Sequence, residues 1–223
     1  MIYFCPFHGE WFEDFSDDNL NYSMCFPICH LRTEAENQTI IDKWNTISPP
    51  SAPELKSVTV NPRTTALLIL DIENSICNTP SCIATIPNIY DLLTKVRQYG
   101  MLVAYSLIPM ENPSDIAKQI TPLPGDPIVK SNVDKFYNTN LEEILNEKGI
   151  KTVIITGYAA NGAVLHTATS AAFRGYNVII PVDCMSANNP YAEQYTAWHM
   201  INSPGTKNRA VLTKVNLISF SPS

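Results

Sequence analysis

The chain has 223 residues, a formal net charge of −6 at neutral pH, 45% hydrophobic residues and 16% charged residues. This length and composition are typical of a globular protein with a sizeable core. An acidic chain without a basic cluster is not expected to bind nucleic acid or an anionic membrane surface. No apolar run approaches the roughly 18 residues of a spanning helix, and the first residues do not resemble a signal peptide. We therefore expect a cytoplasmic protein, or a secreted one if a signal peptide has been removed.

The first 55 residues differ in composition from the rest of the chain. They are rich in aromatic side chains and close with the Pro-rich segment Ser48–Pro53, which is typical of an extended linker. We predict an aromatic-rich extension over residues 1–55 and one large domain over residues 56–223. Because so many aromatic side chains rarely stay in water, the extension is expected to pack on the domain or on a neighbouring subunit. The aromatic residues in question are Tyr3, Phe4, Phe7, Trp11, Phe12 and Phe15.

The six cysteines leave several possibilities open. Cys77 and Cys82 could close a small loop, but free buried thiols are the default expectation in a reducing cytosol. Cys184 is expected to be a packed structural thiol. One set of Cys and His residues in the extension is only loosely similar to a zinc knuckle, so we predict no metal site there. That set is Cys5, His8, Cys25, Cys29 and His30.

From Thr64 onward, strand patterns alternate with helix patterns. Repeated βα units require a parallel sheet with helices on both faces. The sequence therefore predicts an α/β fold with a Rossmann-like, doubly wound parallel sheet, in which ligands bind at the carboxyl ends of the strands. The expected strands are Ala66–Leu70, Leu102–Tyr105, Thr152–Thr156, Asn177–Val182 and Ala210–Thr213. The expected helices are Ile86–Tyr99, Thr139–Glu147, Gly162–Arg174 and Pro190–Asn202.

The stretch from Thr152 to Ala168 predicts a buried strand, a tight turn at Gly157 and a helix from Gly162. A strand–turn–helix unit of this kind directs backbone N–H groups out of the turn. The start of the helix also carries partial positive charge. The turn is thus a candidate site for an oxyanion or a carboxylate.

Three blocks of this sequence resemble the isochorismatase-like superfamily, also called cysteine hydrolases. Ala66–Asp71 is similar to the first strand of the family, which ends in the catalytic Asp. Pro124–Lys130, which is followed by Phe136, is similar to the block that carries the catalytic Lys. The run from Gly157 to Val164 is similar to the turn that carries the nucleophile. The resemblance extends from about Thr64 to Phe220.

The resemblance implies roles for particular residues. Asp71 would be the catalytic acid or base, and Lys130 would be its cationic partner. The backbone N–H groups of Ala159 and Ala163 would hold the oxyanion, and a cis peptide would join Tyr158 to Ala159. Tyr158 is either a substrate contact or a cover for the sheet, and Asn161 is either a helix N-cap or a substrate contact.

The family nucleophile is a Cys, whereas this chain has Ala163 at that position. Covalent acyl transfer through this residue is therefore excluded. Three hypotheses remain. In the first hypothesis, the chain is a hydrolase of a small molecule that uses Asp71 and Lys130 for acid–base catalysis on vinyl ether or C–N bonds. It is alternatively a catalytically inactive protein of the same fold that binds a small ligand or serves in assembly. In the third hypothesis, Ala163 is an engineered replacement for Cys in an amidohydrolase.

The remaining expectations concern cofactors and partners. The segment Glu73–Cys82 has no His, so the metal site of some family members is not predicted here, and no cofactor is expected. Glu73 stands where the family usually has Gln, which puts the usual substrates in question. The expected partners are a small-molecule substrate and further copies of the chain, in a dimer or a tetramer.

Overall fold

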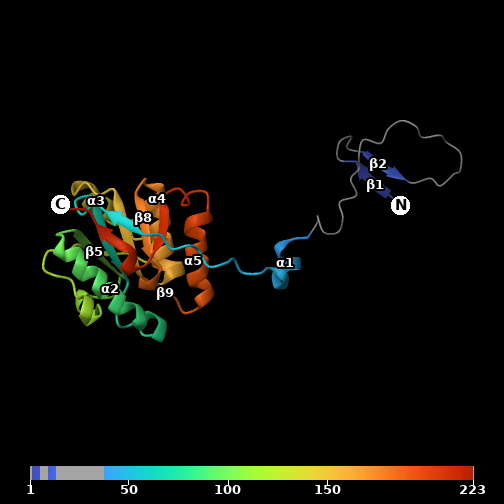
Figure 1. The fold of residues 1–223 in the computed structure, drawn as a ribbon. Coiled ribbons are helices and arrows are strands. Elements are labelled where there is room, and N and C mark those ends of the chain that lie inside the picture. The colour runs from blue at the N-terminus through green and yellow to red at the C-terminus, as the bar shows by residue number, and fades with distance from the viewer. Residues whose placement is uncertain (1, 6–9, 14–37, 223) are drawn as a thin grey trace. The chain divides into compact units, whose positions relative to one another are not determined.

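The computed structural model describes residues 2–5, 10–13 and 38–222 of the chain, which divides into two compact units, Met1–Pro49 and Pro50–Ser223 (Figure 1). In the first unit, strands β1 (Ile2–Cys5) and β2 (Glu10–Glu13) pair in an antiparallel hairpin. A short helix follows, α1 (Ile40–Lys43), and continues into the 3-10 turn η2 (Trp44–Thr46). The side chains of the aromatic and Cys/His sets predicted for the extension lie outside the described residues.

The second unit contains a parallel sheet whose strands lie in the order β10-β8-β7-β4-β5-β6, with β9 paired to β7. Strands β3 (Val58–Val60) and β11 (Ile218–Phe220) form a separate parallel pair. This confirms the predicted parallel α/β fold. The strands of the main sheet are β4 (Thr65–Leu70), β5 (Leu102–Leu107), β6 (Ile128–Lys130), β7 (Thr152–Tyr158), β8 (Asn177–Pro181), β9 (Met185–Ser186) and β10 (Ala210–Thr213).

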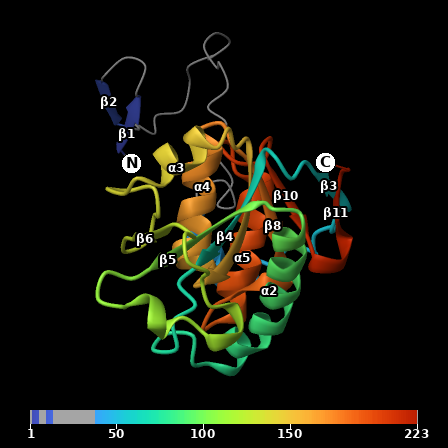
Figure 2. The ribbon, with the colours of Figure 1, turned by 90° about the vertical axis from the view of Figure 1, so that its left-hand side faces the viewer.

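Helices cover both faces of this sheet, with α2 on one face and α4 and α5 on the other (Figure 2). None of the helices within the described residues is long and apolar enough to span a membrane. The helices of the second unit are α2 (Pro80–Gln98), α3 (Leu141–Glu147), α4 (Leu165–Phe173) and α5 (Pro190–Asn202). Shorter helical turns are η3 (Pro113–Asp115), η4 (Lys118–Ile120), η5 (Ala160–Val164), η6 (Val182–Cys184) and η7 (Val215–Leu217).

The central strands divide their side chains between two cores. In β4, Leu68 and Leu70 pack with α3, α4 and α5, whereas Leu67 and Ile69 pack with α2. This alternation follows from the two-residue period of a strand, which directs successive side chains to opposite faces. All six residues of β4 are buried, as expected for a strand covered on both faces.

Helix α2 begins at Pro80, six residues before the predicted start at Ile86. Thr79 is its N-cap, and the Thr79 hydroxyl accepts a hydrogen bond from the Cys82 backbone N–H at 3.3 Å. Pro80 occupies the first turn, where its missing N–H costs no helical hydrogen bond. The prediction therefore missed the first turns of the helix, although Pro and Ser residues are typical of a helix start.

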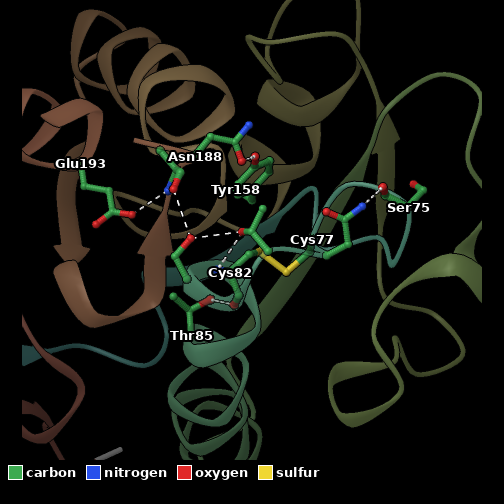
Figure 3. The surroundings of a disulfide bond; sticks show 11 residues. Ser75, Cys77, Cys82, Thr85, Tyr158, Asn188 and Glu193 are labelled. Atoms are coloured by element: carbon green, nitrogen blue, oxygen red, sulfur yellow. Dashed lines mark hydrogen bonds between the residues drawn. A yellow bond between two sulfur atoms is a disulfide. The ribbon is translucent and has the colours of Figure 1, made fainter. Parts of the chain in front are cut away.

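Cys77 and Cys82 form a disulfide bond (Figure 3), with their Cα atoms 5.3 Å apart. The default expectation of free thiols was therefore wrong for this pair. The bond joins the loop that follows β4 to the first turn of α2, and both cysteines are buried. Within residues 38–222, Cys184 is free and buried, as expected. Burial raises the pKa of the Cys184 thiol, which opposes its ionisation to a nucleophilic thiolate.

Replacing both Cys77 and Cys82 by Ser is expected to lower the free energy of unfolding by about 2 kcal/mol, because a closed loop of this length restricts the unfolded chain. Urea denaturation of both proteins measures the difference. Dithiothreitol should destabilise the wild-type chain by a similar amount and leave the double variant unchanged. Equal sensitivity of the two proteins to the reductant would contradict the disulfide.

Candidate active site

The carboxyl ends of β4, β5 and β7 meet in the middle of the sheet. Leu70 at the end of β4 is in register with Ser106 of β5 and with Gly157 of β7. Gly157 has a φ of +128°, and a Cβ atom built on it would lie 2.0 Å from the carbonyl oxygen of Leu70. Only glycine fits so close to that backbone. Gly157, the last residue but one of β7, therefore lies directly against the residue that precedes Asp71.

Asp71 leaves the end of β4 with a φ of +49°, in the left-handed region that non-glycine residues rarely occupy. Such backbone conformations persist where surrounding contacts enforce them, and they cluster at functional sites. Asp71 as a whole residue is 3% exposed. Its Oδ1 accepts a hydrogen bond from the Ser106 hydroxyl at 2.6 Å. Ser106 is thus a residue of the site that the sequence analysis did not identify.

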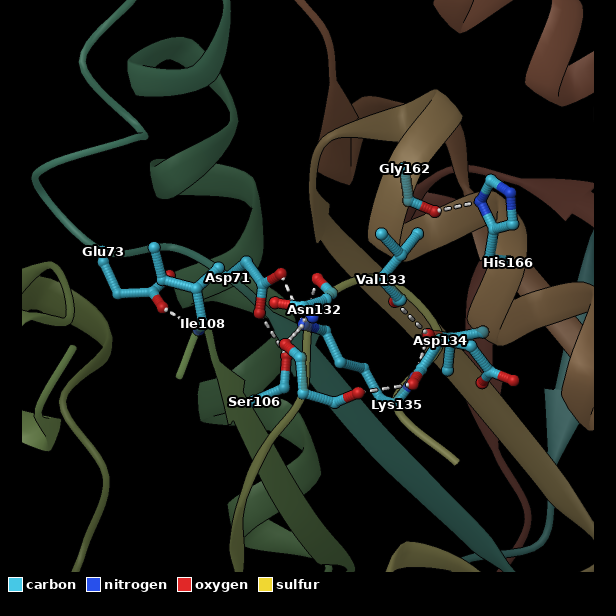
Figure 4. Close-up of polar contacts among 12 residues, drawn as sticks. Asp71, Glu73, Ser106, Ile108, Asn132, Val133, Asp134, Lys135, Gly162 and His166 are labelled. Carbon is cyan, nitrogen blue, oxygen red and sulfur yellow. Dashed lines mark hydrogen bonds and ion pairs between the residues drawn. The ribbon is translucent and has the colours of Figure 1, made fainter. Parts of the chain in front are cut away.

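The cation that pairs with Asp71 is Lys135 (Figure 4), whose Nζ lies 2.7 Å from Asp71 Oδ2. Lys135 is fully buried. Its ammonium group also donates to the backbone carbonyl oxygens of Ser131 at 2.7 Å and Asn132 at 3.2 Å. These three acceptors match the three donors of an ammonium group. Because both charges are buried, each depends on the other for compensation.

The predicted pairing of Asp71 with Lys130 was therefore wrong. Lys130 is exposed at the end of β6, directly after the buried Val129. Successive strand residues face opposite sides, so burying Val129 turns Lys130 outward. The chain returns to the core only at Phe136, which is 5% exposed, and this return carries Lys135 inward. The backbone N–H of Lys135 also donates a hydrogen bond to Thr167 Oγ1 on α4 at 3.1 Å.

Two carboxyl groups of the site have raised pKa values. Burial raises the pKa of Asp71, against the opposing effect of the Lys135 charge and the Ser106 hydrogen bond. Burial, followed by the negative charge of Asp71, raises the pKa of Glu73 to about 7. Glu73 is fully buried, and its Oε1 accepts a hydrogen bond from the Ile108 N–H at 2.8 Å. Displaced pKa values of this kind are typical of functional sites, although ion pairs also produce them.

The turn after β7 contains the other predicted residues. Tyr158 and Ala159 are joined by a cis peptide, as the resemblance implied. The turn η5 then has a non-helical backbone at Gly162 before α4 begins. Ala163 is buried and Ala159 is half-buried. Because β7 lies beside β4, this turn follows the strand next to the one that carries Asp71.

Tyr158 is the last residue of β7, and Asn161 lies in the turn that follows it. The half-buried Tyr158 donates a hydrogen bond from its hydroxyl to Asn188 Oδ1 at 2.7 Å, so it connects β7 to the segment after β9 (Figure 3). Asn161 is exposed and lies inside η5. The N-cap of α4 is Val164, so the N-cap alternative for Asn161 was wrong. The His166 ring contacts the Gly162 carbonyl oxygen at 2.8 Å (Figure 4).

The fold and this arrangement at the strand ends define a doubly wound α/β protein with a buried Asp–Lys pair beside a strand–turn–helix unit. Residues 65–213 match the isochorismatase domain, so the chain belongs to the isochorismatase family. An uncharacterized isochorismatase family protein from Bacillus subtilis, YaaI, is 36% identical over 93 residues. That match covers 41% of this chain and 51% of YaaI, so the chain aligns with about half of that relative.

Two further relatives have names that state an activity or a location. The secreted isochorismatase effector Isc1 of Verticillium dahliae is 29% identical over 144 residues, which cover 57% of this chain and 75% of Isc1. The N-carbamoylsarcosine amidase of an Arthrobacter species is 34% identical over 108 residues, which cover 45% of this chain and 41% of the amidase.

Solved structures share the fold. An isochorismatase family protein from Burkholderia thailandensis superposes with a TM-score of 0.62 at 21% identity, over 72% of this chain and 95% of that chain. The nicotinamidase of Staphylococcus aureus superposes with a TM-score of 0.60 at 22% identity, over 68% of this chain and 99% of that chain. At these identities, the likeness concerns the fold alone.

Replacing Lys135 by Met is expected to lower the free energy of unfolding by about 3 kcal/mol, because it leaves the Asp71 carboxylate buried without a partner. Urea denaturation at neutral pH measures the loss. The Lys130→Met variant is the matched control and should change stability by less than about 0.5 kcal/mol. Adding Asp71→Asn to Lys135→Met should restore part of the loss. Equal effects at the two lysines would contradict the assignment of the pair.

Proposed function

We propose that this chain is a hydrolase that cleaves a vinyl ether or C–N bond in a small molecule, without a covalent enzyme intermediate. The observation that carries the proposal is the buried Asp71 carboxyl group, which lies between Ser106 and Lys135 with a raised pKa. A carboxyl group whose pKa is raised toward the working pH can both give and accept a proton. The family membership supports hydrolysis as the reaction class.

On a vinyl ether, Asp71 would transfer its proton to the terminal alkene carbon, which leaves an oxocarbenium ion. Water would add to that cation, and the proton released by the water would return to Asp71. The resulting hemiketal would then separate into a carbonyl compound and an alcohol. Lys135 would hold the negative charge that remains on Asp71 after the first transfer, which lowers the energy of the charged intermediate.

On a C–N bond, Asp71 would act first as the base for an attacking water. The carbonyl oxygen would become an oxyanion, and the backbone N–H groups of Ala159 and Ala163 would stabilise it. The proton taken by Asp71 would then pass to the leaving nitrogen. The Arthrobacter relative named N-carbamoylsarcosine amidase supports this second substrate class.

Ala163 decides which mechanisms are open to this site. An alanine methyl group cannot attack a carbonyl carbon, and the buried Cys184 thiol has a raised pKa that disfavours a displaced nucleophile. Direct attack by water therefore replaces the acyl-enzyme route. If Ala163 replaces a natural Cys, the same site would bind the substrate of an amidohydrolase and retain it.

Asp71→Asn is expected to lower kcat by at least about 100-fold, because the amide can neither give nor accept the proton. Substrate affinity should change little, because Asn has nearly the same shape. Hydrolysis of isochorismate, N-carbamoylsarcosine and nicotinamide, followed by chromatography, is the measurement. Alkylation of wild-type protein with iodoacetamide is the control and should leave turnover intact. Turnover that survives in Asp71→Asn would refute the proposed role.

The rival function is that of an inactive protein that binds a small ligand. Calorimetry with the same three compounds separates the two functions. A binding protein would give saturable heat but no hydrolysis product from any of them, and Asp71→Asn would have no turnover to remove.

We also propose that the chain forms a homo-oligomer, a dimer or tetramer, through its N-terminal unit. Around α1, several large apolar side chains are exposed. Ile41 is 74% exposed and Trp44 is 67% exposed, with Ile40 and Ile47 nearby in sequence and also exposed. Exposed apolar groups of this kind are typical of contact surfaces between proteins. The Pro-rich segment 48–53 can carry the unit to a neighbouring subunit.

Deleting residues 1–50 is expected to reduce the particle mass to that of a smaller assembly, because it removes this apolar surface. Light scattering measures the mass. In the full chain, Trp44→Ser should weaken association by about tenfold or more, whereas Tyr191→Ser, at an exposed position of α5, is the matched control and should not. An unchanged mass after the deletion would contradict the proposal.

The disulfide favours the secreted alternative over the cytoplasmic one. Disulfide bonds persist in oxidising compartments and are rare in the cytosol. The Verticillium relative is named a secreted effector, which supports the same location for this chain. We therefore propose an oxidising compartment as its place of action.

A further inference from the structure

One oxygen atom of the buried Glu73 carboxyl group lacks a hydrogen-bond partner among the described residues. Glu73 is 0% exposed, and its Oε1 is occupied by the Ile108 N–H. Its Oε2 has no hydrogen-bond partner among the described residues. Buried polar atoms in folded proteins nearly always have a partner. Because an unpaired buried oxygen costs free energy, this atom indicates a group that the chain itself does not provide.

The position of Glu73 connects it to the proposed active site. Asp71 and Glu73 are two residues apart after β4, and their partners Ser106 and Ile108 are two residues apart at the end of β5. The two carboxyl groups therefore lie beyond the carboxyl ends of the same two neighbouring strands (Figure 4). Burial raises the pKa of Glu73, and the nearby negative charge of Asp71 raises it further.

The charged groups around Glu73 favour its neutral form. Asp71 opposes a second negative charge, and Lys135 favours one, but the ammonium group of Lys135 is already paired with Asp71. In the loop that packs against Glu73, Glu111 accepts a hydrogen bond from Ser75 and Asp115 accepts one from the Asn112 N–H. Neither of these two loop carboxylates can stabilise a negative charge on Glu73. A neutral Glu73 has an O–H group at the atom that has no partner.

We propose that Glu73 is a substrate-facing hydrogen-bond donor, whose Oε2–H group binds the carbonyl oxygen of an amide or ureido compound at the Asp71 site. This inference rests on the proposed function for its choice of ligand class. The Oε1 atom keeps its bond from Ile108, which holds the carboxyl plane and directs Oε2. No proton is transferred from Glu73 in this role.

The protonation state is tested first, on the full-length chain. Carbon-13 NMR of the glutamate carboxyl groups, with Glu73→Gln to identify the Glu73 signal, should give a midpoint near pH 7. A midpoint below about 5, close to that of an ordinary glutamate, would overturn the proposal.

The ligand is tested by calorimetry with nicotinamide and N-carbamoylsarcosine, whose carbonyl groups do not titrate between pH 6 and pH 8. Binding to wild-type protein should weaken about tenfold from pH 6 to pH 8, because deprotonation removes the donor. Glu73→Gln retains an N–H donor, so it should bind equally at both pH values. Glu73→Met should bind weakly at both, although its melting temperature shows that it folds. Glu143→Gln, on the exposed face of α3, is the matched control and should behave as wild type.

Three results would contradict the proposal: a tenfold weakening that persists in Glu73→Gln, wild-type affinity in Glu73→Met, or no binding of either probe. Calorimetry requires no turnover, so it separates this inference from the proposed hydrolysis. A chain that binds a probe with the expected pH dependence but releases no product would retain the Glu73 role and contradict the hydrolase.

Discussion

The buried pair between Asp71 and Lys135 is the interaction on which the site depends. Transferring either charge alone from water to the interior would cost several kcal/mol, so the pair persists only because each charge compensates the other. Neighbouring polar groups support both members of the pair. Two carbonyl oxygens complete the ammonium coordination, and the Ser106 hydroxyl occupies the second carboxylate oxygen. The outcome is a buried carboxyl group with restricted access to water, which suits the acid–base role proposed for it.

Most of the fold could be predicted from the sequence because its strands are short, β-branched and separated by helical patterns. The boundaries of α5 and β10 were predicted to the residue, since Pro190 marks a helix start and the run from Ala210 to Thr213 has no helical period. The start of α2 was missed because the Pro and Ser residues before Ile86 suit a loop as well as a helix cap. The β3–β11 pair was missed because its strands have three residues each and lie about 160 residues apart.

The site was predicted less well than the fold, and the reason is physical. Asp71 follows a buried strand directly, so its position is set by local sequence. The position of Lys135 depends on how far the chain runs after β6 before it returns to the core at Phe136, and neither charge nor spacing reveals that length. The structure has two lysines within six residues, and only burial distinguishes them. Ser106 was missed because one Ser in an apolar strand carries no pattern of its own.

The close approach of Gly157 to Leu70 limits how the sequence of such a protein can diverge during evolution. With no space for even one extra carbon, the end of β4 and the turn after β7 are held in a fixed mutual position, so the acid and the amide-bearing turn form one inherited unit. The loops that contribute Glu111 and Asn188 are not held by that contact. Diversification toward new small molecules would therefore proceed through these loops, while the glycine contact conserves the reacting geometry.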